Sequence, residues 1–123
     1  MVDVRDVPPE VAARVMAGLS SADPRGLMKE SDIGPMCQAG RCVQVASDRG
    51  VATLVLVDVD GTVWVDAARA DGPSARLCDD LDDAIAATPG ARRIAFQTKR
   101  RGLVRRAIAR GYRVVGYILE KEL

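Results

Sequence analysis

The chain has 123 residues, of which 48% are hydrophobic and 28% are charged, and its formal net charge is +1. At this length we expect one globular domain, residues 1–123, with enough apolar residues to bury a core. No uninterrupted apolar run approaches the roughly 20 residues that span a bilayer, and residues 1–10 carry Asp3, Asp6 and Glu10 rather than a cationic leader, so we expect a cytoplasmic setting.

The first third of the chain predicts a strand and then a helix. Residues 2–7 favour a short strand, and Pro8-Pro9 opens a helix because proline is tolerated in a first turn. Residues 25–40 fit either a short helix or an irregular lid, and both interpretations stay open. The first helix has an apolar face made of Val11, Ala12, Val15, Met16 and Leu19.

A change from helical to alternating periodicity at Arg41 predicts a meander of three antiparallel strands. The first strand ends at the turn of residues 47–50, the second is the apolar run 51–57, and the third covers residues 62–68. Asp60-Gly61 is a favourable hairpin turn between the second and third strands.

The remaining residues predict two further helix–strand units. A helix from about Pro73, with aspartates on one side, ends at Pro89-Gly90. Ile94 and Phe96 then alternate with polar residues, as in a half-buried strand.

The last predicted helix is basic and amphipathic, and Gly111 stands where such a helix stops. After this glycine, the β-forming residues between Tyr112 and Leu119 predict a closing strand.

Several runs of residues are similar to one known family. Ala109-Arg110-Gly111-Tyr112 stands in place of a usual "lysine-leucine-glycine-phenylalanine", residues 62–67 are similar to a central fourth strand, and residues 90–95 to the start of a fifth. With the element order, these runs resemble the GCN5-related N-acetyltransferase (GNAT) family over nearly the whole chain. The resemblance implies an α+β fold with a mixed sheet, in the order β-α-(α)-β-β-β-α-β-α-β.

The resemblance also implies a cofactor site. In the GNAT family acetyl-CoA lies between the fourth and fifth strands, with its pyrophosphate on the backbone N–H groups that begin the next helix. The matching run, residues 69–74, makes Arg69, Gly72 and Ser74 candidate cofactor-binding residues, and the amide of Ala67 a candidate oxyanion donor.

Three features of this loop oppose cofactor binding. Pro73 has no N–H to offer a phosphate, Ser74 replaces a small residue, and Asp71 adds a negative charge. In a second alignment the loop is simply shortened and residues 71–73 form a plain turn. Both alignments stay open.

Candidate catalytic groups are few. The chain has no histidine, which removes Ser-His and Cys-His nucleophile schemes, and its three cysteines fit no zinc spacing, so we expect reduced thiols and no metal. The family places a general-acid tyrosine where this chain has Arg106 or Ala107. Asp66, on the fourth strand, is a candidate general base if burial raises its pKa, and otherwise a solvent-facing carboxylate.

A competing motif is the run Val57–Thr62, which matches the phosphatase signature of the haloacid dehalogenase superfamily. There Asp58 would attack phosphate and Asp60 would handle the proton. That catalytic strand normally opens its domain, whereas a long segment precedes it here, and too few residues follow Thr98 for the remaining motifs. A hairpin turn through Asp-Gly accounts for the same sequence by backbone conformation alone.

The charges divide between two helices. The basic helix Lys99 to Arg110 and the acidic residues 79–83 form either solvated faces, salt-linked to each other, or a contact surface for phosphate, nucleic acid or an acidic partner. Aromatic residues make up 3% of the chain, so sequence-specific nucleic-acid binding through base stacking is not expected.

Two hypotheses of function therefore come from the GNAT resemblance. In one, the acyl-CoA site is degenerate and the chain is a non-catalytic binding or structural protein. Such a chain is similar to GNAT-like products of bacteriophage morphogenesis genes, and if it is encoded by a phage we expect it in the virion. In the other, an acetyl-CoA-dependent N-acetyltransferase takes a small amine between residues 25–40 and the sheet.

Overall fold

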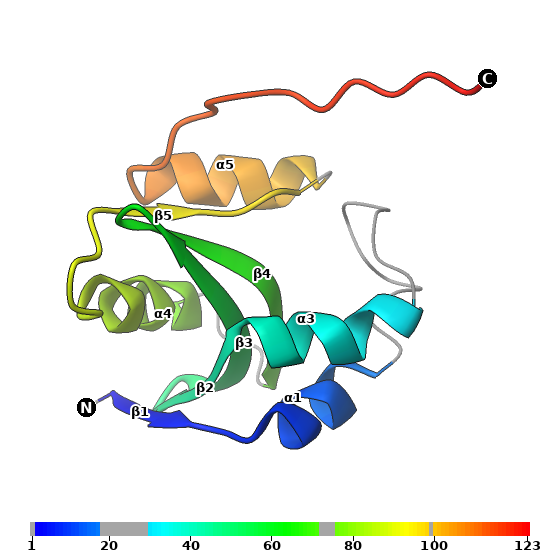
Figure 1. Cartoon of the computed structure of the whole chain (residues 1–123). Helices are drawn as coiled ribbons and strands as arrows, with labels where there is room; N and C mark the ends of the chain where they lie inside the picture. Colours follow the sequence, from blue (N-terminus) through cyan, green and yellow to red (C-terminus); the bar gives the residue numbers. More distant parts are fainter. Residues whose placement is uncertain (1, 18–29, 72–75, 99) are drawn as a thin grey trace.

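The computed structural model describes residues 2–17, 30–71, 76–98 and 100–123, and the elements named here lie within them. In chain order they are β1 (Asp3–Asp6), α1 (Pro9–Met16), the 3-10 helix η1 (Glu30–Asp32), α3 (Ile33–Ala39), β2 (Arg41–Ser47), β3 (Gly50–Val59), β4 (Thr62–Asp71), α4 (Leu77–Ala86), β5 (Arg93–Ala95) and α5 (Arg101–Ala109) (Figure 1). None of these helices has the length and apolar character that crossing a bilayer requires.

The strands form one mixed sheet in the order β1-β2-β3-β4-β5. Neighbours from β1 to β4 are antiparallel, and β5 pairs with β4 in parallel. A parallel pair needs a crossover connection, and α4 provides it between β4 and β5. The predicted meander and the α+β class are both confirmed.

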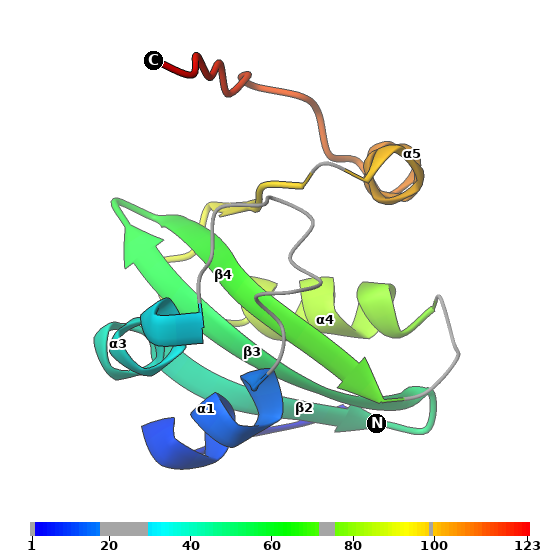
Figure 2. The ribbon, with the colours of Figure 1, turned by 90° about the vertical axis from the view of Figure 1, so that its right-hand side faces the viewer.

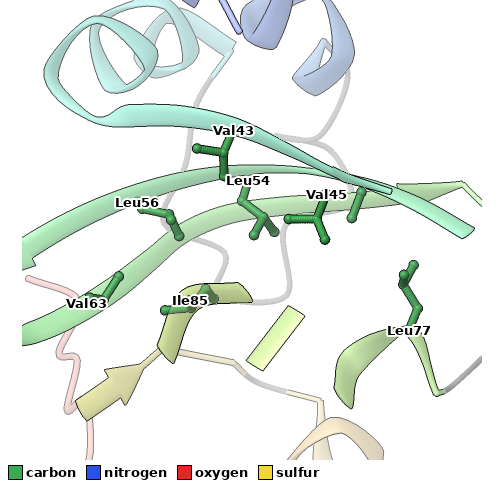
Figure 3. Close-up of a cluster of buried hydrophobic side chains, with 8 residues drawn as sticks. Val43, Val45, Leu54, Leu56, Val63, Leu77 and Ile85 are labelled. Atoms are coloured by element: carbon green, nitrogen blue, oxygen red, sulfur yellow. The ribbon is translucent and has the colours of Figure 1, made fainter. Parts of the chain in front are cut away.

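Helices cover both faces of the sheet, and each face has its own buried cluster (Figure 2). Cys42 and Val43 are successive residues of β2 and belong to different clusters, because side chains alternate across a strand. The cluster under α4 contains Val43, Val45, Ala52, Leu54, Leu56, Val63, Leu77 and Ile85 (Figure 3). The cluster under α1 and α3 contains Ala12, Met16, Ile33, Cys37, Cys42, Val55 and Ala67.

The hairpin between β3 and β4 turns through two residues in the left-handed region. Asp60 has φ 52° and Gly61 has φ 84°, which suits the two-residue turn that matches strand twist. The N–H groups of Arg92 and Arg93 donate to the Gly61 carbonyl at 2.7 and 3.0 Å. The Asp-Gly turn predicted from the sequence is therefore confirmed, and it also fixes the start of β5.

Two of the cysteines lie together in the cluster under α1 and α3. The Cys42 thiol donates a hydrogen bond to the Cys37 carbonyl at 3.3 Å, and burial raises the pKa of both thiols. Cys78, on α4, is half-buried. All three are free thiols.

The prediction of a closing strand over Tyr112–Leu119 is wrong. These residues form no strand, and Val115, Tyr117 and Leu119 are exposed. Their segment runs past α5 and away from the sheet (Figure 1). A β-forming composition gives a strand only where a neighbouring strand and a packing surface receive it, and the segment meets neither here.

Several boundaries also differ from the sequence predictions. β1 and β5 are shorter than predicted. Of the two interpretations of residues 25–40, the described part contains a short helix, α3, while residues 25–29 lie outside the described ranges, as does Leu19. The helix expected from Pro73 begins, within the described part, at Leu77.

Candidate functional site

β4 carries a β-bulge near its middle. Val55 of β3 lies opposite Ala67, whereas Leu56 lies opposite Val65, so Asp66 is the extra residue on β4. A bulge interrupts the ladder of hydrogen bonds locally and increases the twist of the strand. The candidate general base of the sequence analysis therefore occupies the irregular point of the sheet.

One edge of β4 is open beyond the first part of the strand. β5 pairs with Thr62, Val63 and Trp64, and no other described strand lies on that side of β4. From Val65 to Asp71, backbone groups that face this edge have no partner in a described strand. The bulge lies within this open stretch.

The two side chains at the bulge have different surroundings. Ala67 is buried in the cluster under α1 and α3, which holds the β4 backbone against those helices. Asp66 is half-buried. Asp66 and Ala67 thus both lie on the part of β4 that β5 does not pair.

The Arg69 side chain is bound to the end of α1. Its guanidinium Nη1 donates to the carbonyls of Val15 and Ala17 at 3.0 and 3.1 Å. A cation at a helix C-terminus satisfies carbonyls that lack a helical partner and favours the negative end of the dipole. The other two candidate cofactor-binding residues, Gly72 and Ser74, lie outside the described ranges.

The first turn of α4 is acidic. Asp79 and Asp80 occupy it, and Asp79 is exposed. Asp80 is only 9% exposed, and its carboxylate accepts hydrogen bonds from Ser47 Oγ at 2.7 Å and Arg49 Nη1 at 3.4 Å. These contacts fasten the β2–β3 turn to α4, and they place carboxylates where the helix dipole favours negative charge.

The diphosphate of acyl-CoA does not fit the residues at this helix start. In the arrangement that the GNAT resemblance implies, the first turn of α4 would hold the diphosphate with free N–H groups. Here the first turn of α4 carries the exposed Asp79, and Asp71 ends β4, so negative charge lies on both sides of the connection to this helix. Repulsion between these carboxylates and a diphosphate opposes binding.

Asp58 and Asp60 belong to a hairpin, and the phosphatase alternative is not supported. Asp58 lies on antiparallel β3, and its Oδ1 accepts a hydrogen bond from the Gly61 N–H at 3.1 Å. This contact stabilises the turn that the Asp-Gly sequence predicts. Within the described ranges, no three Cys, Asp or Glu side chains gather closely enough to hold a metal ion.

Tyr112 joins α4 to the end of α5. Its hydroxyl donates to Asp82 Oδ1 at 2.7 Å, and Arg110 Nε donates to Asp82 Oδ2 at 3.0 Å. The ring of Tyr112 makes an edge contact with Phe96, with 5.4 Å between centroids. Burial, with the hydrogen bond to Asp82, raises the pKa of the Tyr112 hydroxyl well above its usual value. A hydroxyl held in this way is a poor proton donor for catalysis.

The predicted link between the acidic and basic helices consists of this Asp82–Arg110 pair. Opposite charges on the two helices were visible in the sequence, but the pairing partner was not, because it depends on how α5 crosses α4. The α5 arginines at positions 101, 105 and 106 are exposed. Lys99 lies outside the described ranges.

The element order, the mixed sheet and the open edge of β4 define a GNAT-like fold. A proposed acetyl transferase from Pyrococcus furiosus aligns with a TM-score of 0.62 and 12% identity, over 100% of both chains. A proposed acetyltransferase of the gnat family from Xanthomonas campestris pv. campestris gives 0.58 and 15%, over 100% of this chain and 94% of that one. A predicted acetyltransferase from Clostridium acetobutylicum gives 0.58 and 9%, over 99% and 96%.

No protein-family model matches the chain, and no curated protein matches it in sequence. At 9–15% identity, the similar structures establish the fold alone.

Proposed function

We propose that this chain is a GNAT-fold protein with a degenerate acyl-CoA site, and that it acts by binding or as a structural part rather than by acyl transfer. The observation that carries the proposal is the acidic first turn of α4, with Asp79 and Asp80 where a diphosphate would have to bind. A helix start already occupied by carboxylates has little remaining attraction for a second anion.

Three further features support the proposal. The Arg69 guanidinium is used at the end of α1, the loop contains Pro73 with no N–H, and the Tyr112 hydroxyl is bound to Asp82. Each removes a group that an acyltransferase would use. The resemblance to bacteriophage-encoded GNAT-like products favours a structural role in virion assembly.

The test is a titration of acetyl-CoA against the full chain, followed by thermal unfolding. We expect no stabilisation, whereas a ligand at 100 times its dissociation constant adds about 2.7 kcal/mol. A variant with Pro73→Gly and Asp79→Ser restores an amide and removes a charge, so it should gain affinity. Asp83→Ser, an exposed position farther along α4, is the matched control and should gain none. Stabilisation of the unaltered chain would overturn the proposal.

The bulge at Asp66 favours a second candidate, an acetyl-CoA-dependent N-acetyltransferase acting on a small amine. The open edge of β4 offers a carboxylate and backbone amides together, and the similar structure from Clostridium acetobutylicum is described with acetyl-CoA. Release of free CoA thiol from acetyl-CoA in the presence of a panel of amines tests it. Amine-dependent release that Asp66→Asn abolishes would establish this candidate instead.

A further inference from the structure

The segment that follows α5 is apolar on both sides and exposed. Tyr117 is 89% exposed and Leu119 is 92% exposed, and Val114, Val115 and Ile118 are also exposed. In an extended chain, Val114 and Ile118 would face one side, and Val115, Tyr117 and Leu119 the other. Strands that are apolar on both sides are typical of positions inside a sheet, covered on both faces.

The start of this segment is fixed to the rest of the molecule. Gly111 has φ 96°, its N–H donates to the Ile108 carbonyl, and the Tyr112 N–H donates to the Ala107 carbonyl, which is a Schellman ending of α5. Asp82 then holds Arg110 and Tyr112. Beyond this anchor, Figures 1 and 2 show the chain running away from the sheet.

The sheet has an unpaired edge at β5. β5 pairs with β4 on one side, and no other described strand lies on its outer side. The opposite edge, β1, has exposed charged side chains at Asp3, Arg5 and Asp6, which discourage pairing with a further strand. β5 has one exposed charged residue, Arg93, followed by the apolar Ile94 and Ala95.

α5 is also incompletely covered. Within the described residues, neither buried cluster contains a residue of α5, and Ile108 in its apolar stripe is half exposed. The last third of the chain therefore holds both an apolar segment without a neighbour and a sheet edge without a strand.

We propose that residues 113–119 of one chain add as a strand to the β5 edge of a second copy, which returns its own segment in the same way. Each chain carries both the strand and the edge, so one two-fold axis satisfies both needs, as in strand exchange between protomers. Residues 113–119 span about 23 Å when extended, which is the length of the added strand.

Two features favour a second copy over closure within one chain. The segment lies on the opposite side of α5 from its own sheet in the view of Figure 1. In addition, Glu120 and Glu122 follow its apolar part, and the exposed arginines of the partner's α5 provide the opposite charge. This inference does not depend on whether acyl-CoA binds.

The first test is the mass of the full chain in solution by light scattering. We expect a dimer. A full-length variant with Val115→Lys, Tyr117→Lys and Leu119→Lys should be monomeric and should keep its helical circular dichroism signal, because these side chains are exposed in the single chain. Asp3→Lys with Asp48→Lys raises the net charge comparably at exposed positions outside the last third, and this control should remain dimeric. A monomeric unaltered chain, or a dimeric lysine variant, would refute the proposal.

A mixing experiment separates strand exchange from pairing between two segments. The lysine variant keeps its β5 edge, so an excess of it should form mixed dimers with the unaltered chain, detected by native mass spectrometry. If the segments pair only with each other, no mixed dimer forms and the proposal fails. If the unaltered chain is monomeric and the lysine variant has a lower free energy of unfolding, the segment closes onto its own chain. This result also contradicts the proposal.

Discussion

The strands β1–β4 with α1, α3 and α4 differ sharply from the last third of the chain, which contains β5, α5 and the exposed segment. The first region contributes nearly all of both buried clusters, whereas α5 contributes the buried Ala107 and the segment after it is exposed. The family resemblance, however, is carried largely by sequence in the last third. A sequence signal for a fold and the packing that stabilises it can therefore lie in different parts of one chain.

The largest expected effect is a matched pair of leucine substitutions. Leu54 is 1% exposed in the cluster under α4, so Leu54→Ala should lower the free energy of unfolding by about 2–5 kcal/mol. Leu119→Ala should change it by less than about 0.5 kcal/mol in the monomer. Urea denaturation at low protein concentration measures both. Equal losses would remove the distinction between the two regions.

Asp82→Ala should give the next largest effect, because Asp82 joins the two regions. It removes hydrogen bonds from Tyr112 and Arg110, and a loss of about 1–3 kcal/mol is expected. Hydrogen exchange should quicken in α5 more than in β2 and β3. Asp83→Ala, at an exposed neighbouring position, is the control and should leave α5 unchanged.

Arg69→Ala should have a smaller effect, confined to the first region. Loss of its contacts with the Val15 and Ala17 carbonyls should lower the free energy of unfolding by about 0.3–1 kcal/mol. Amide hydrogen exchange should become faster in α1. Arg105→Ala, on the exposed side of α5, should be neutral. An unchanged α1 would show that the Arg69 side chain is free for another role.

The last prediction concerns Tyr112 and the alkaline range alone. Its pKa is raised in the folded chain, so the unfolded chain loses this proton first as pH increases. The contribution of the Tyr112 hydroxyl to folding stability is therefore complete below about pH 10, the ordinary tyrosine pKa. It is lost as pH rises toward and through the pKa of the folded chain. Tyr112→Phe should flatten the alkaline part of a stability curve measured by urea denaturation. A variant with the same alkaline slope as the unaltered chain would contradict this assignment.

Local rules predicted the meander because its information is local. Alternation along β2–β4 and the Asp60-Gly61 turn depend on nearby residues, and the structure bears out both. The bulge at Asp66 could not be predicted, because a bulge is defined by the register between two strands. The strand predicted at Tyr112–Leu119 failed for the same reason, since a strand requires a partner that composition does not specify.

The buried thiol pair has a practical consequence for chemical labelling. The thiolate is the reactive form of cysteine, and the raised pKa of Cys37 and Cys42, together with their burial, keeps both in the unreactive form at neutral pH. Cys78 is half-buried on α4. A maleimide dye should therefore modify Cys78 first, which gives a single-site fluorescent probe on the native chain without mutagenesis.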